Sequence, residues 1–152
     1  KGGCDFNMKQ DLAAARAVFG SKVALWQLPV NVYGTVEVTM AEMALKIRPC
    51  GTAGRYLYDL MEQYNLTTDE PYTLRKGEGW NFGDSPVVAA LLGCDLRQNF
   101  HMEPAPVLGD GGRYLPGSGR AIRVYDSVDV RFLLEDFFAK LALCYGPRTN
   151  KA

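Results

Sequence analysis

The stretch of sequence that decides the fold class runs from Lys22 to Val30 and reads KVALWQLPV. It is short, and most of its residues are apolar, β-branched or aromatic. This pattern is typical of a strand that is buried on both faces of a parallel sheet. The polar residues Asn31 and Tyr33 follow its carboxyl end. Because open α/β sheets bind ligands beyond the carboxyl ends of their strands, polar residues at strand ends are the first candidates for a functional site.

Helical signals precede this strand. Residues 11–19 are rich in alanine, begin with Asp11 and are followed by Gly20. An acidic residue at the start and a glycine just past the end mark the two ends of a helix. The sequence therefore predicts a helix that leads into the strand.

Three more helices are predicted after the strand. Residues 36–47 and 52–63 are expected to form a helical hairpin, because Pro49 cannot continue the helix that precedes it. A third helix is predicted to open at Asp84-Ser85-Pro86 and to run to about Leu92, with its proline in the first turn. Asp84, just before that turn, can cap this helix.

The C-terminal part of the chain contains one more strand and one more helix. Residues 95–119 are predicted to be loops, apart from a possible short strand over 105–108. Residues 120–125 alternate with period two, as expected for a half-exposed edge strand, and residues 130–143 form an amphipathic helix. The apolar face of this helix consists of Leu133, Leu134, Phe137, Phe138 and Leu141.

The order of elements is helix, strand, three helices, strand and helix, which predicts an α/β layered fold in a single domain. Two or three strands are few for a sheet that helices cover on both faces. We therefore expect the rest of the sheet to lie outside this chain. The first seven residues, KGGCDFN, contain no initiator Met and resemble a strand end and loop from mid-domain, so we expect an N-terminal half to be missing.

Composition and charge exclude several classes of function. The chain has 17 Lys and Arg residues against 17 Asp and Glu residues, so no overall field favours nucleic acid or an anionic membrane. It has no run of about 18 apolar residues that could span a bilayer. Its four cysteines form no CxxC pair, which disfavours a zinc site or a dense disulfide framework and favours a reduced, cytoplasmic setting.

Asp5 and Asn7 are the first candidates for ligand binding. In an extended segment, residues two apart point to the same side, so the carboxylate and the amide would face one way, opposite Phe6. Such a pair suits sugar hydroxyl groups, each of which donates and accepts hydrogen bonds. The alternative is a turn with an Asx hydrogen bond ahead of the helix at Asp11.

Asp84 and Trp80 are the next candidates. Asp84 stands at the entrance to an apolar helix, where a carboxylate can be a cap or a ligand for a hard cation. Trp80 lies among glycines that include Gly79 and Gly83, which indicates either a mobile lid that stacks on a base or a loop with a docked tryptophan. His101, the only histidine, is interpreted as a surface loop residue with no partner that can be assigned.

Several of these segments together resemble the inosine-uridine preferring nucleoside hydrolases. Residues 5–7 and the alanine-rich block at 11–16 are similar to the family's Glu-Phe-Asn and Asp-Pro-Glu-Ala-Ala segments. Residues 28–32, which read LPVNV, resemble its Val-Pro-Leu-Asp-Val strand end. Asp84 stands where the family has an acidic residue that binds both calcium and ribose, and residues 124–138 resemble its final strand and helix. The resemblance covers nearly the whole chain.

This resemblance implies a fold, a reaction and a set of ligands. The fold would be the C-terminal part of an open, mostly parallel, Rossmann-like sheet flanked by helices, with residues 1–152 as the C-terminal portion of one domain. The reaction would be hydrolysis of the N-glycosidic bond of ribonucleosides, with Ca²⁺ as cofactor. Asp5 and Asn7 would bind ribose hydroxyls, Asp84 would ligate calcium and touch the ribose, and Trp80 would contact the base. The partner would be a nucleoside, in a homo-oligomer (dimer or tetramer).

The chain departs from the family in three ways. The aspartate-rich motif that supplies most calcium ligands and activates the water is absent, so no catalytic residue is assigned here. Asp5 replaces the family's usual glutamate, and Gly83 stands where many members have a histidine that is thought to assist the leaving base. The alternative to an enzyme is therefore a noncatalytic nucleoside-binding, sugar-binding or structural relative.

Overall fold

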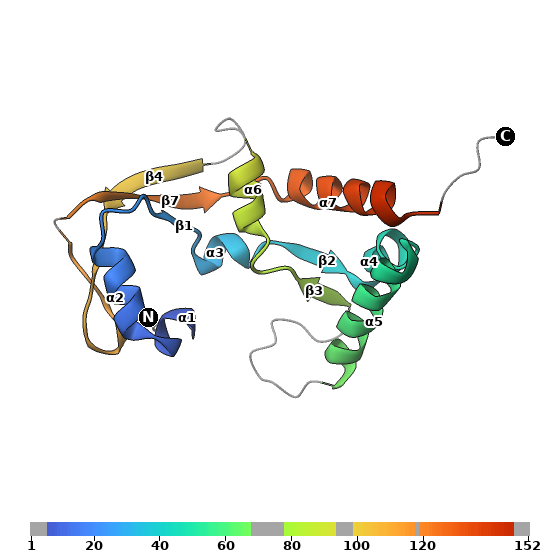
Figure 1. The fold of residues 1–152 in the computed structure, drawn as a ribbon, viewed down its shortest axis with the longest axis horizontal. Helices are drawn as coiled ribbons and strands as arrows, with labels where there is room; N and C mark the ends of the chain where they lie inside the picture. The colour runs from blue at the N-terminus through green and yellow to red at the C-terminus, as the bar shows by residue number, and fades with distance from the viewer. Residues whose placement is uncertain (1–5, 68–77, 94–98, 118, 148–152) are drawn as a thin grey trace. The chain divides into compact units, whose positions relative to one another are not determined.

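The computed structural model describes residues 6–67, 78–93, 99–117 and 119–147 (Figure 1). It is a mixed α/β structure without a closed barrel, and its strands form one three-stranded sheet and two two-stranded sheets. The chain divides into two compact units. The first comprises Lys1–Pro29 and Asn99–Asp126, and the second comprises Val30–Gln98 and Ser127–Ala152. No described helix is long and apolar enough to cross a membrane.

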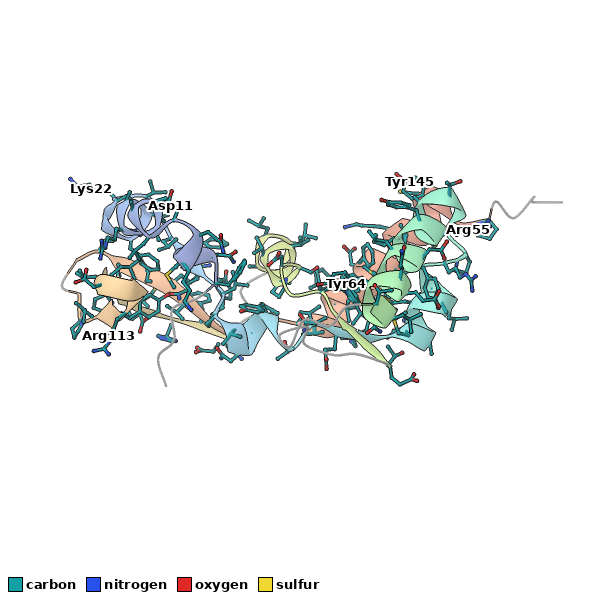
Figure 2. All side chains as sticks on the ribbon, turned by 90° about the horizontal axis from the view of Figure 1, so that it is seen from below. Asp11, Lys22, Arg55, Tyr64, Arg113 and Tyr145 are labelled. Atoms are coloured by element: carbon teal, nitrogen blue, oxygen red, sulfur yellow. The ribbon has the colours of Figure 1, made fainter. Side chains whose placement is uncertain are left out.

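The first unit is built on the three-stranded sheet. Its helices are α1 (Phe6–Gln10) and α2 (Leu12–Gly20), and its strands are β1 (Trp26–Gln27), β4 (Asn99–Pro104), β5 (Val107–Leu108), β6 (Tyr114–Leu115) and β7 (Ala121–Ser127), with a short 3-10 helix, η2 (Asp110–Gly112). The strand order in the sheet is β1-β7-β4, and β5 pairs with β6 in a separate antiparallel ribbon. The helix predicted over residues 11–19 is confirmed as α2. Its cap is Asp11, labelled in Figure 2, whose carboxylate accepts from the Ala14 amide at 2.8 Å.

Strand β1 confirms the parallel pairing that was predicted for residues 22–30. The strand is shorter than predicted, and it is not buried on both faces. Trp26 lies opposite Arg123, and Gln27 lies opposite Val124, in parallel register with β7. The strand has only two residues, Trp26 is 43% exposed, and Val30 already belongs to a helix. Proline has no N–H to donate to a ladder, so Pro29 ends the strand.

Strand β7 is central, so its prediction as an edge strand is wrong. Ile122 and Val124 point to a small core with Ala105, against which Phe19 of α2 and Leu25 pack. The alternation of buried and exposed residues in β7 was visible in the sequence. The position of the strand depends on β4, whose residues, Asn99–Pro104, were predicted to be loop.

The second unit consists mainly of helices. These are α3 (Val30–Tyr33), α4 (Met40–Lys46), α5 (Gly51–Thr67), α6 (Pro86–Leu92) and α7 (Val130–Tyr145), and its strands are β2 (Glu37–Thr39) and β3 (Gly79–Asn81). Strands β2 and β3 pair antiparallel, with Val38 opposite Trp80. The helix predicted over 36–47 therefore begins later than expected, at Met40, where the Thr39 hydroxyl accepts from the Glu42 amide.

The core of the second unit forms where α4, α5 and α7 meet β2. Its buried residues are Val38, Met43, Ile47, Tyr58, Met61 and Phe138. The predicted amphipathic helix over 130–143 is confirmed as α7, which is capped by Asp129 through the Phe132 amide at 2.8 Å. Its residues Leu133 and Phe138 are buried, as the pattern indicated.

Replacing Phe138 by alanine tests this core. Phe138 is 4% exposed, so the substitution removes a buried ring and leaves a cavity, which typically costs about 3–5 kcal/mol. Leu143 lies on the same helix but is 86% exposed, so Leu143→Ala should change stability by less than about 0.5 kcal/mol. Urea unfolding followed by circular dichroism measures both values. Equal effects of the two substitutions would contradict this packing.

Candidate functional site

The residues predicted to bind a ligand fall in both units. Asp5 lies outside the described residues. Asn7 is exposed in α1, so the extended backbone assumed for residues 5–7 is wrong from Phe6 onward, because Phe6–Gln10 is helical. Strand-like alternation therefore does not orient the Asn7 side chain. Trp80 and Asp84 belong to the second unit, whereas Asn7 belongs to the first.

Trp80 is part of the framework of the second unit. It lies in β3, is half-buried and packs against the core cluster around Val38. Its ring meets Tyr64 of α5 edge-on, with centroids 5.7 Å apart at an interplanar angle of 77°. This placement agrees with the docked tryptophan considered as an alternative and disfavours a mobile lid.

Asp84 occupies an exposed turn between β3 and α6. The expected cap is wrong, because Ser85 is the N-cap residue of α6 and makes no side-chain capping bond. Pro86 occupies the first turn, as predicted. Within the described parts of the chain, the Asp84 carboxylate makes no hydrogen bond or ion pair. It is therefore accessible to a ligand and is not needed to hold the helix.

Asn81 and Phe82, which the sequence analysis did not select, hold this turn in place. The side-chain amide of Asn81 donates to the Gly34 carbonyl at 3.2 Å, and the Phe82 backbone N–H donates to the Val36 carbonyl at 2.8 Å. A Cβ at Gly83 would lie 3.0 Å from Asn81 Oδ1 and 3.6 Å from Tyr33 Cδ2. Tyr33 follows the end of the strand predicted over residues 22–30, but its proximity to Gly83 depends on tertiary contacts.

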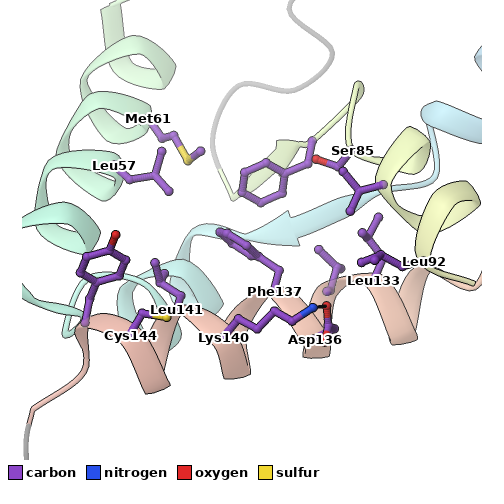
Figure 3. Close-up of a pocket in the computed structure, with 14 residues that line it drawn as sticks. Leu57, Met61, Ser85, Leu92, Leu133, Asp136, Phe137, Lys140, Leu141 and Cys144 are labelled. Atoms are coloured by element: carbon purple, nitrogen blue, oxygen red, sulfur yellow. Dashed lines mark hydrogen bonds and ion pairs between the residues drawn. The ribbon is translucent and has the colours of Figure 1, made fainter.

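An apolar groove begins beside this turn. It has a volume of about 640 Å³ and lies between α5, α6 and α7 (Figure 3). Ser85, the neighbour of Asp84, lines it, and so do Phe82 and Phe137, whose rings meet edge-on at 6.0 Å. The ion pair between Lys140 and Asp136, at 2.6 Å, supplies the charged groups of its lining. The groove can hold an apolar or aromatic group next to the carboxylate-bearing turn.

The described residues do not make up a calcium site. Calcium takes six to eight oxygen ligands, and Asp84 supplies one carboxylate. No group of three or more His, Cys, Asp or Glu side chains among the described residues could hold a metal. Asp84 has the right donor chemistry, but the remaining ligands would have to come from elsewhere.

His101 has partners, contrary to the sequence interpretation. It lies in β4, where Nδ1 is 3.0 Å from Asp126 Oδ1 of β7 and Nε2 is 3.7 Å from Glu103 Oε2. The hydrogen bond to Asp126 raises the pKa of His101, and Glu103 adds a smaller electrostatic contribution in the same direction. The pattern of a lone histidine gave no sign of this cluster because its main partner is 25 residues away.

Neither the models of known protein families nor the curated proteins with which this chain was compared match it. The resemblance to nucleoside hydrolases therefore depends on the quoted sequence segments alone.

The raised pKa of His101 predicts a pH-dependent stability. A group whose pKa is higher in the folded state stabilises the fold fully below its unfolded pKa, near 6.5, and this contribution is lost as the pH rises through the folded pKa. The urea midpoint should therefore fall between about pH 6.5 and the folded pKa of His101. His101→Gln should abolish this step, and Asp126→Asn should reduce it. A histidine NMR titration with a pKa at or below 6.5 would contradict the contact.

Proposed function

We propose that this chain takes part in hydrolysis of the N-glycosidic bond of ribonucleosides, as the C-terminal portion of a nucleoside hydrolase domain. The proposal is supported by the ordered resemblance of its segments. It is also supported by the parallel pair of β1 and β7, which is the pairing expected of an open α/β sheet. A cytoplasmic location is consistent with the free thiols of Cys50 and Cys144.

The observation that carries the proposal is the meeting of two family-like segments. Helix α3 contains the end of the segment that resembles the family's strand end, and the Gly83–Asp84 turn contains its acidic position. The hydrogen bonds from Asn81 Nδ2 to the Gly34 carbonyl and from the Phe82 N–H to the Val36 carbonyl join the residues next to these two segments within the second unit. A ligand at the turn would thus be approached by both segments.

The residues present allow specific roles. The Asp84 carboxylate would accept hydrogen bonds from ribose hydroxyls and position the sugar. The apolar groove that begins at Ser85 would hold the base, and Phe82 would make the contact with the base that was first assigned to Trp80. Cleavage would pass through an oxocarbenium-like state. Because the family's aspartate-rich motif is absent from this sequence, we expect the chain alone to be inactive.

The alternative proposal is a noncatalytic nucleoside-binding, sugar-binding or structural relative. It is favoured by the absence of a metal-holding cluster from the described residues. The hydrolase and a nucleoside-binding or sugar-binding relative both require the Asp84 turn to bind the sugar, but only the hydrolase requires calcium and turnover. Calcium is part of the proposal because of the resemblance and because the Asp84 carboxylate offers one oxygen donor.

Substituting Asp84 tests the hydrolase proposal. In the complete protein, Asp84→Ala should weaken calcium binding and lower kcat/KM for inosine about a hundredfold or more, or about 2.7 kcal/mol of barrier. Stability should stay within about 0.5 kcal/mol, because the side chain does not cap α6. Asp59→Ala, at another exposed aspartate of the second unit, is the matched control. Unchanged kinetics in Asp84→Ala would refute its proposed role.

Gly83 gives a second test. Without a side chain at this position the enzyme lacks a positioned acid for the departing base, which typically costs about a hundredfold to ten-thousandfold in rate. A riboside whose leaving group needs no protonation, p-nitrophenyl riboside, should therefore be strongly preferred over inosine. Gly83→His should reduce this preference by raising kcat/KM for inosine. A native kcat/KM ratio near one would show that another group already protonates the base.

A further inference from the structure

Strand β4 is the edge strand of the three-stranded sheet in the first unit. Five of its six residues are exposed, and Phe100 is half-buried. Edge strands present backbone N–H and C=O groups that can pair with another strand. Natural edges are often protected by lysines or prolines; β4 has no lysine, and its one proline is its last residue.

The outward-facing backbone groups of β4 can be identified from one hydrogen bond. The Ala105 N–H, just past the strand, donates to the Arg120 carbonyl at 2.8 Å, on the β7 side. Backbone groups alternate in direction along a strand, so His101 and Glu103 also direct theirs toward β7. Phe100, Met102 and Pro104 direct theirs toward the open edge. A proline is tolerated at such a position because it has no N–H to leave unpaired.

We propose that β4 is an interface for a second copy of this chain, which pairs antiparallel about a two-fold axis at Met102. Each Met102 would exchange N–H···O bonds with the partner's Met102. Each Phe100 N–H would donate to the partner's Pro104 carbonyl. His101 would lie directly opposite the partner's Glu103, and Glu103 opposite the partner's His101. This inference is independent of the proposed function.

Charge complementarity selects both the partner and the register. Outward-facing residues must pair with outward-facing residues, so the neighbouring two-fold registers shift the axis to His101 or to Glu103. The first would place two histidines opposite each other, and the second would place two glutamates opposite each other. Like charges directly opposite destabilise a pair, whereas opposite charges stabilise it. The Met102 axis is the two-fold register that places opposite charges together.

The surroundings of the strand support this pairing. Asp126 favours the charged form of His101, which strengthens its attraction for a carboxylate. On the other face of the strand, Met102 and the flanking Phe100 and Pro104 would form an apolar contact with their counterparts. Met102 is 57% exposed in the single chain, so it has surface to bury. A surface that complements itself is what a two-fold dimer requires.

Disulfide trapping tests the register. Residues opposite each other in a hydrogen-bonded antiparallel pair have Cα atoms about 5.5 Å apart, within the range that a disulfide spans. Under mild oxidation, Met102→Cys should therefore give a crosslink between the introduced thiols of the two copies, identified by mass spectrometry of the linked peptide. Glu103→Cys, whose counterpart would be His101, should give much less of its own crosslink. Equal crosslinking of both variants, or none in Met102→Cys, would overturn the proposal.

Association of the uncrosslinked chain gives a second measurement. Sedimentation equilibrium of the native chain should show a concentration-dependent dimer. Met102→Lys places two like charges opposite each other at the axis and should raise the dimer dissociation constant about tenfold or more. Met102→Leu keeps the apolar contact and should leave it nearly unchanged. A monomer at all concentrations, or equal dissociation constants for the two variants, would contradict the interface.

Discussion

The architecture depends on the parallel pairing of β1 with β7. This pairing is held by bonds such as that from the Arg123 N–H to the Leu25 carbonyl at 3.0 Å, which joins the N-terminal segment to a strand close to the C-terminus. Parallel strands cannot be joined by a tight turn, so a long connection is required between them. Here the chain uses that connection to build most of a second unit with a core of its own.

The cation of Arg123 is one reason why such a short parallel pair can persist. Its guanidinium carbon lies 4.5 Å from the ring centroid of Trp26 in β1 and 3.9 Å from that of Phe100 in β4. It thus bridges both neighbours of β7 on one face of the sheet, while Ile122 and Val124 pack on the other. Cation–π contacts of this kind contribute about 0.5–2 kcal/mol each. Side chains across the strands therefore supplement a ladder that is only two residues long on one side.

The parts of the fold that the sequence predicted well are those with local signals. Helix α2 has its own cap at Asp11, and α7 carries a long apolar stripe, so periodicity and capping were sufficient. Strand β4 was missed because its polar residues and its proline give no alternating pattern. Residues Glu37–Thr39 were assigned to a helix because the helical pattern that follows them was extended too far. Their strand conformation is fixed by pairing with β3, a contact between segments distant in sequence.

The candidate site shows the same division between local sequence signals and tertiary contacts. Gly83 is a position at which packing does not explain the residue type. The sequence located the Asp84 turn, but Tyr33 is distant from it in sequence and lies near Gly83 only through tertiary contacts. At Gly54 and Gly117 a Cβ would collide with the backbone carbonyls of Ile47 and Ala105, so glycine is required there. At Gly83 the backbone φ is not positive, and the closest obstacle is the movable end of the Asn81 side chain. Because a larger residue would fit there after a small shift, packing alone does not demand glycine, and the choice of residue at position 83 can instead reflect the chemistry of the turn.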